Sequence, residues 1–199
     1  MDRTETYELI IQKADSLFRR FGMKTSVAAI AGELAMSPAN IYKFFPSKRA
    51  IIEAVSERRM LVLRKQLLAV TKSRKPAFER IKDLMRCVVA YFEELIEKES
   101  DLLYLDLIKD MLQFELALRE KSWSFTKEFH ALLREQLARL IRDGVRTGEM
   151  HVPDPEEASL ALLDCLCRVV EPLLLLEDPQ PARNERLERQ LRFLARALT

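Results

Sequence analysis

Glycine and proline are scarce in this chain, which contains 4 glycines and 8 prolines among 199 residues. Runs of consecutive β-branched residues are also scarce, whereas leucine, alanine, glutamate, arginine and lysine are abundant. This composition favours helices and argues against strands, so we expect an all-α fold without a sheet. Because 48% of the residues are hydrophobic and 32% are charged, the chain can bury a globular core, and disorder is not expected.

Cysteine and histidine are also few. The chain has three cysteines, Cys87, Cys165 and Cys167, and an odd number does not indicate a disulfide framework. Cys165 and Cys167 would also project to different faces of a helix. The only histidines, His130 and His151, lack the glutamate three residues earlier that supplies ligands in di-iron bundles. We therefore expect no disulfide, metal or cofactor, and a reducing cytoplasm as the surroundings.

Long uncharged hydrophobic runs are absent. The most apolar stretch, residues 158–176, is interrupted by Asp164, Arg168 and Glu171, and the N-terminus, with Glu5 among its first residues, has no signal-peptide pattern. We expect a soluble intracellular protein. The chain also lacks a glycine-rich phosphate loop, a GxSxG elbow and a metal-ligand cluster, so we expect no enzymatic activity.

Two short helices joined by a tight turn are predicted between Thr25 and Lys48. Ser26 and Ser37 can each cap a helix by accepting a hydrogen bond from a free backbone amide, and the second helix opens with Pro38. The first helix keeps its apolar residues on one face, at Val27, Ile30, Ala31 and Leu34. This pattern is typical of a helix-turn-helix.

The charge around these helices favours a nucleic acid as partner. No acidic residue occurs between Glu33 and Glu53, whereas Lys43, Lys48 and Arg49 all lie in that window. Residues 1–60 contain 10 basic and 7 acidic residues, and the rest of the chain contains 23 and 24. The small basic excess of the protein therefore lies with the helix-turn-helix, where it would meet a phosphate backbone without repulsion.

The second short helix supplies the candidates for reading DNA. Ile41 and Phe44, three apart, can face inward and leave the other positions to the outer face. Lys43 is expected to contact phosphate, Tyr42 either contacts DNA or supports the fold, and Asn40 either bonds a base edge or is simply exposed. The candidate DNA-binding residues are Thr25, Ser26, Ser37, Pro38, Ala39, Asn40, Tyr42, Lys43 and Lys48.

This segment resembles the helix-turn-helix of the TetR family of transcriptional regulators, of the TetR/AcrR type. The resemblance covers roughly residues 1–55. It rests on Ile30-Ala31, Ala35-Met36-Ser37, Ile41-Tyr42-Lys43-Phe44-Phe45 and Ser47-Lys48, preceded by Leu17-Phe18 and Phe21-Gly22. Ala35 and Ala39 stand where the family often carries glycine, and a left-handed backbone at Ala35 would cost about 1 kcal/mol. We therefore expect strain in the turn.

Helical periodicity continues along the rest of the chain. A helix before the helix-turn-helix is expected to end at Gly22, and another helix is expected to begin after Ser47. A later helix is expected to end at Gly144 or Gly148, and Asp154 is expected to cap the next one. With the resemblance, this organisation implies a helix-turn-helix domain over residues 1–50, a connecting helix and linker over 51–75, and a ligand-binding and dimerisation domain over 76–199. We expect about nine helices in total.

The C-terminal region carries more apolar surface than one small subunit readily covers, which predicts a homodimer. The last helix has leucines at spacings of four, three and four, and its neighbour is apolar on nearly all sides. In the TetR family the two C-terminal helices form a four-helix dimer interface, and the resemblance implies that role here. The candidate interface residues are Leu162, Leu166, Val169, Leu173, Leu187, Leu191, Leu194 and Leu198.

An effector pocket is the remaining expectation. Pro172 predicts a kink that can shape a pocket, and the row Asp164, Arg168, Glu171 either pairs along one helix face or binds a polar ligand group. Methionine and aromatic residues supply either a plain core or an apolar cavity. The candidate lining residues are Met85, Phe92, Tyr104, Met111, Phe114, Trp123, Phe125 and Phe129.

These patterns together predict a homodimeric repressor that binds a palindromic operator and is released by a small apolar effector of unknown identity. Such a protein would be cytoplasmic and would lie at the nucleoid when bound to DNA. Two alternatives stay open. One is a DNA-binding protein of the same fold controlled by a protein partner, and the other is a helical binding module or enzyme that does not bind DNA.

Overall fold

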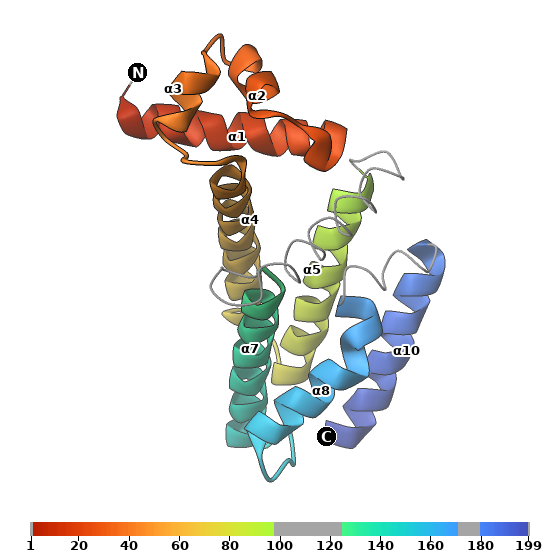
Figure 1. Ribbon diagram of the computed structural model, residues 1–199. Coiled ribbons are helices and arrows are strands. Elements are labelled where there is room, and N and C mark those ends of the chain that lie inside the picture. Colours follow the sequence, from red (N-terminus) through yellow and green to blue (C-terminus); the bar gives the residue numbers. More distant parts are fainter. Residues whose placement is uncertain (1, 98–124, 171–179, 199) are drawn as a thin grey trace. The chain divides into compact units, whose positions relative to one another are not determined.

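The computed structural model describes residues 2–97, 125–170 and 180–198 (Figure 1). Within these ranges the chain forms eight α-helices, one short 3₁₀ helix and no strand. The elements are α1 (Arg3–Phe21), η1 (Gly22–Lys24), α2 (Val27–Glu33), α3 (Pro38–Tyr42), α4 (Lys48–Thr71), α5 (Ala77–Glu97), α7 (Phe125–Thr147), α8 (Pro155–Val170) and α10 (Gln180–Leu198). The prediction of an all-α fold is confirmed.

Some sequence predictions fall outside this part of the chain. The kink at Pro172 does, as do Glu171, Leu173 and four candidate pocket residues, Tyr104, Met111, Phe114 and Trp123. The side chains of Phe125 and Val169 also lie outside what the structure describes. All of these stay predictions.

The chain divides into two compact units, and one boundary between them falls inside α4. The first includes Met1–Leu61, hence α1, α2, α3 and the beginning of α4. The second includes Val62–Glu94 and Thr126–Thr199. Of the described helices, none is both long and apolar enough to cross a membrane.

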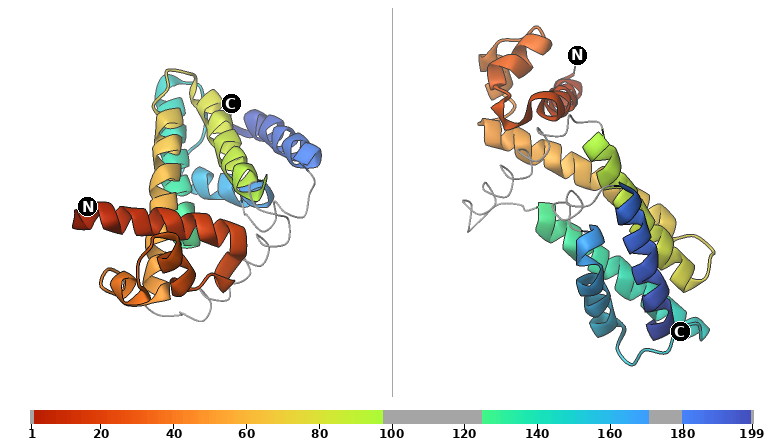
Figure 2. Two further views of the ribbon diagram at one scale, coloured as in Figure 1. Left: turned by 90° about the horizontal axis from the view of Figure 1, so that it is seen from above. Right: turned by 90° about the vertical axis from the view of Figure 1, so that its right-hand side faces the viewer.

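The first unit is built on α1, with α2 and α3 packed along it (Figures 1 and 2). Asp2 begins α1 in a capping box, in which its backbone N–H donates to Glu5 Oε2 at 3.0 Å. All three helices and the start of α4 contribute to one apolar core. Its buried residues are Ile10, Ile11, Ala14, Leu17, Phe18, Val27, Ile30, Ala31, Ile41, Phe45, Ile51, Ala54 and Val55.

The turn between α2 and α3 contains a strained residue. Ala35 has a φ of 52°, and among the described residues no other non-glycine residue has a positive φ. Two hydrogen bonds close the end of α2 around it, from the Met36 N–H to the Ala31 carbonyl at 2.9 Å and from the Ala35 N–H to the Gly32 carbonyl at 3.1 Å. This is a Schellman turn with alanine in the place that glycine usually takes. The predicted left-handed backbone at Ala35 is confirmed.

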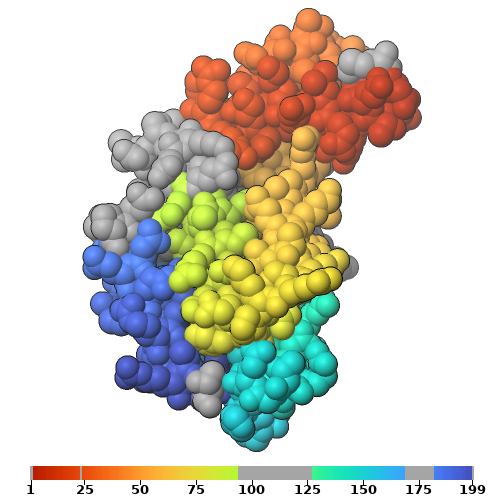
Figure 3. Space-filling model, turned by 180° about the vertical axis from the view of Figure 1, so that it is seen from behind, coloured from red at the N-terminus to blue at the C-terminus, as the bar shows by residue number. Residues whose placement is uncertain are grey.

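In the second unit, α5, α7, α8 and α10 pack with the last part of α4. Figure 3 shows α5 and α10 as neighbours on one face, and two ion pairs join them. Arg86 holds Glu188 through two hydrogen bonds of 2.8 and 3.0 Å. Arg183 lies 3.7 Å from Glu93. The hydrogen bond from Arg86 holds the pKa of the Glu188 carboxyl below its usual value, against the opposing effect of its partial burial.

The connection from α7 to α8 follows its sequence signals. Gly148, with a φ of 76°, directly follows the last residue of α7, so of the two predicted ends, Gly144 and Gly148, the later one is right. Asp154 Oδ1 accepts hydrogen bonds from the backbone N–H groups of Glu156 and Glu157, at 2.8 and 3.2 Å. The predicted start of α8 is thereby confirmed.

The leucine stripe of the last helix is buried within a single chain, which corrects its predicted use. The helices α8 and α10 lie side by side (Figure 2), and the six described leucines of the predicted dimer interface are only 0–7% exposed. They are Leu162, Leu166, Leu187, Leu191, Leu194 and Leu198. One subunit therefore covers these side chains itself. The outer face of α10 instead presents Phe193, which is 69% exposed.

Replacing Ala35 by glycine should stabilise the protein, because glycine adopts a positive φ without steric cost. We expect a gain of up to about 1 kcal/mol, which is roughly 2–4 °C in Tm for a chain of this size. The matched control is Ala39→Gly, because Ala39 is exposed inside α3 and glycine there should lower Tm. An Ala35→Gly variant that melts no higher than the wild type, measured by circular dichroism, would contradict the strain.

Two glycine-to-alanine substitutions should have opposite effects. A Cβ at Gly144 would lie 2.7 Å from Met150 Sδ and 3.1 Å from Ala77 Cβ, whereas a Cβ at Gly32 would meet nothing within 4 Å. Gly144→Ala should therefore cost about 1–3 kcal/mol through overpacking, and Gly32→Ala should gain about 0.5–1 kcal/mol as a helix former. Equal melting temperatures for the two variants would refute this view of the α7 packing.

Candidate nucleic-acid interface

The helix-turn-helix begins each of its helices with a serine cap. Ser26 Oγ accepts a hydrogen bond from the Ala29 N–H at 3.0 Å, and Ser37 Oγ accepts one from the Asn40 N–H at 3.3 Å. Ser47 caps α4 in the same way, through the Ala50 N–H at 3.1 Å. The three predicted caps are confirmed.

The orientation of α3 follows from what it buries. Ile41 is fully buried, Phe45 is 2% exposed and Phe44 is half-buried. The opposite side of this five-residue helix is therefore turned outward, and Tyr42 is 50% exposed. The other exposed candidates at this face are Ser26, Ser37, Pro38, Ala39 and Lys43, while Asn40 and Lys48 are half-buried.

Thr25 is the exception among the nine candidates. Its side chain is 3% exposed, and its hydroxyl donates to the Leu17 carbonyl of α1 at 3.1 Å. The hydroxyl is therefore used to fix η1 and the start of α2 against α1. We withdraw Thr25 from the set of residues expected to contact phosphate.

Aromatic and ionic contacts hold α1 to the elements on either side of α3. The rings of Tyr7 and Phe45 are stacked with centroids 4.7 Å apart. Burial raises the pKa of Tyr7, and the carboxylates of Glu57 and Glu8 raise it further, so the neutral phenol is favoured. Near the end of α3, the Arg3 guanidinium carbon lies 5.9 Å from the centroid of the Phe44 ring.

The acidic residue nearest in sequence to α3 is already paired. Lys13 Nζ lies 3.1 Å from Glu33 Oε2, which joins α1 to α2. The middle of α4 is held to α1 by Asp15, which accepts from Arg59 Nε at 2.7 Å and lies 3.3 Å from Arg19. The electrostatic result is an outward face on which Lys43 and Lys48 are not opposed by an unpaired neighbouring carboxylate of α2.

The described candidates for the effector pocket lie in the core of the second unit. Met85, Phe92 and Phe129 are at most 2% exposed, and the rings of Phe92 and Phe129 meet edge to face at 5.4 Å. Their packing shows a core cluster, and their predicted contact with a ligand stays untested. No group of acidic, histidine or cysteine residues in the described part of the chain could hold a metal ion.

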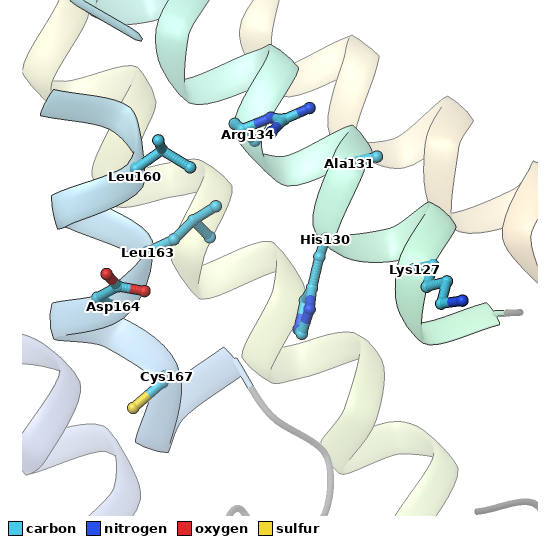
Figure 4. Close-up of a pocket in the computed structure, with 8 residues that line it drawn as sticks. All are labelled: Lys127, His130, Ala131, Arg134, Leu160, Leu163, Asp164 and Cys167. Atoms are coloured by element: carbon cyan, nitrogen blue, oxygen red, sulfur yellow. The ribbon is translucent and has the colours of Figure 1, made fainter. Parts of the chain in front are cut away.

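Sequence reasoning missed a pocket between α7 and α8. Figure 4 shows its lining, of which the sequence had singled out Asp164 alone as a candidate for ligand binding. Three basic residues of α7, Lys127, His130 and Arg134, contribute to it. Their spacing of three and four residues can be seen in the sequence as a basic stripe along one helix face. The sequence does not show which residues of α8 lie opposite this stripe, because that depends on how the two helices pack.

Comparison with known proteins finds two family matches. Residues 10–55 match the family described as "Bacterial regulatory proteins, tetR family", and residues 86–189, more than half of the chain, match "Tetracyclin repressor-like, C-terminal domain". Among curated proteins, none matches the chain significantly.

Solved structures share the fold over nearly the whole chain. A transcriptional regulator from Cytophaga hutchinsonii is 22% identical with a TM-score of 0.71, and the match covers 97% of this chain and 98% of that one. A TetR transcription regulator from Haloarcula marismortui is 18% identical with a TM-score of 0.72, covering 98% and 100%.

A third similar structure is FadR from Thermus thermophilus, a TetR-family transcriptional repressor in complex with lauroyl-CoA. It is 21% identical, its TM-score is 0.58, and the match covers 94% of this chain and 92% of that one. The two family matches, together with the helix-turn-helix geometry, place this chain in the TetR family of DNA-binding transcriptional regulators.

Proposed function

We propose that this protein is a homodimeric, ligand-responsive repressor that binds a palindromic operator. The observation that carries the proposal is the outward face of α3, where Tyr42 and Lys43 are exposed on a helix anchored by the buried Ile41. A helix held in this way can enter the major groove as a rigid element. Phosphate contacts would supply affinity, and Asn40 and Tyr42 would supply selectivity.

The proposal assigns the second unit to effector binding and dimerisation, in keeping with the domains expected over residues 76–199. The repressor FadR of Thermus thermophilus, which has the same fold, was solved with lauroyl-CoA, and this supports a small, largely apolar effector here. Because α4 contributes to both compact units, it is the element through which ligand binding would change the spacing of two reading heads. Repression would be relieved by a population shift.

Dimerisation is proposed to use the outer faces of the C-terminal helices. The leucines of α10 are occupied within the subunit, whereas Phe193 on the same helix is 69% exposed. A large exposed aromatic side chain is a common anchor of protein interfaces. The two copies would present two reading heads, which matches a palindromic operator.

Removing a side chain from the reading face should weaken DNA binding. Lys43→Ala should lower affinity for DNA upstream of the gene and reduce the slope of log K against log salt by about 1, the value for one lost phosphate contact. Tyr42→Ala should cost about 1–3 kcal/mol of specific binding.

Fluorescence anisotropy at several salt concentrations measures both effects. The matched control is Lys72→Ala, which removes the same charge from an exposed lysine just after α4. Wild-type affinity and salt slope in both reading-face variants would contradict the proposed mechanism. Binding that requires a second protein, with no response to any small molecule, would favour the alternative in which a protein partner controls the regulator.

A charge at the centre of the proposed interface should break the dimer. Phe193→Lys should raise the dimer dissociation constant at least about tenfold, because it places an unpaired charge where an aromatic ring would be buried. Leu61→Lys is the control, since Leu61 is 58% exposed on α4. Sedimentation analysis decides the matter, and equal dissociation constants for both variants and the wild type would exclude Phe193 from the interface.

A further inference from the structure

The pocket between α7 and α8 lies within the second unit and has a volume of about 440 Å³. This volume is in the range of sites for small organic molecules. Leu160 and Leu163 project from α8 towards α7, and His130 extends from α7 into the space between the two helices (Figure 4). The pocket thus combines two leucines of α8 with basic side chains of α7.

Its charge is unequally distributed. Lys127, His130 and Arg134 recur at intervals of three and four residues on α7, which places them along one face of that helix. The opposite wall contributes a single carboxylate, that of Asp164. Within the described part of the chain, Arg134 and Asp164 line the same pocket without forming an ion pair with each other. The lining thus contains two permanently charged basic side chains, those of Lys127 and Arg134, and one carboxylate.

We propose that this pocket binds an organic monoanion with an apolar chain. The carboxylate of this ligand would pair with the basic side chains of α7, and the apolar chain of the ligand would lie against Leu160 and Leu163. An arginine suits this role, because a guanidinium can bind a carboxylate through two parallel hydrogen bonds. Asp164 would repel a second negative charge, so a monoanion is favoured over a dianion. If the proposed function holds, such an anion is the effector; this step rests on the proposed function, whereas the binding site itself does not.

Ligands of one chain length and different charge test the inference. Isothermal titration of the full-length protein would use dodecanoate, dodecanol and dodecyltrimethylammonium, each below its micelle concentration. Dodecanoate should bind most tightly. Arg134→Gln should weaken dodecanoate binding about tenfold and leave dodecanol binding unchanged, whereas Leu163→Asp should weaken both. Arg139→Gln is the matched control, since Arg139 is exposed on the same helix and does not line the pocket.

The cysteines of α8 provide a second readout that does not depend on DNA. Cys167 lines the pocket, whereas Cys165, two residues away and also exposed, does not. Dodecanoate should slow alkylation of Cys167 in a Cys165→Ser variant and leave alkylation of Cys165 unchanged in a Cys167→Ser variant. Burial raises the pKa of the Cys87 thiol, so its background reaction is expected to be slow.

The outcomes separate the two proposals. Equal binding of all three ligands, no effect of Arg134→Gln, or unprotected Cys167 would overturn the anion site, even if another compound released the protein from DNA. Binding of dodecanoate with protection of Cys167 would establish the site. If operator affinity in the anisotropy assay were then unchanged by saturating dodecanoate, the anion site would stand and its role as the effector site would fail.

Discussion

Burial of Ile41 is the constraint on which the proposed DNA-reading surface depends. The helix that carries it, α3, has five residues, and so short a helix is not stable on its own in water. It persists because Ile41 and Phe45 enter the core shared by α1, α2 and the start of α4. The outward direction of Tyr42 and Lys43 is therefore a consequence of packing. Any change that loosens this core would also make the positions of these two side chains less well defined.

The same core is supported from outside by polar contacts that all lead to α1. Lys13 reaches α2, Asp15 accepts from Arg59 of α4, and Tyr7 stacks on Phe45 beyond α3. The Lys13–Glu33 pair is partly exposed, and such a pair contributes little free energy by itself, so its value here is geometric. Together these contacts orient α2, α4 and the segment after α3 with respect to α1, which a small core of aliphatic side chains would do less specifically.

Local signals in the sequence were sufficient to predict several helix caps and the turn after α2, whereas contacts between distant segments could not be predicted from it. Helix caps and left-handed turn residues depend on neighbours within a few residues, so the sequence alone can predict them. This applies to the caps at Ser26, Ser37 and Asp154 and to Ala35. The burial of Thr25 depends on the Leu17 carbonyl of another helix. Likewise, the leucine stripe of α10 indicates that one face is buried, but periodicity does not say whether the covering surface belongs to the same chain or to a partner.

The continuity of α4 has a consequence for how the molecule loses its structure. Because one boundary between the compact units falls inside this helix, the two units share the hydrogen-bonded turns of α4 at that point. Unfolding of one unit would therefore leave the other with a frayed end of α4. Separating the two units along α4 therefore requires part of this helix to melt.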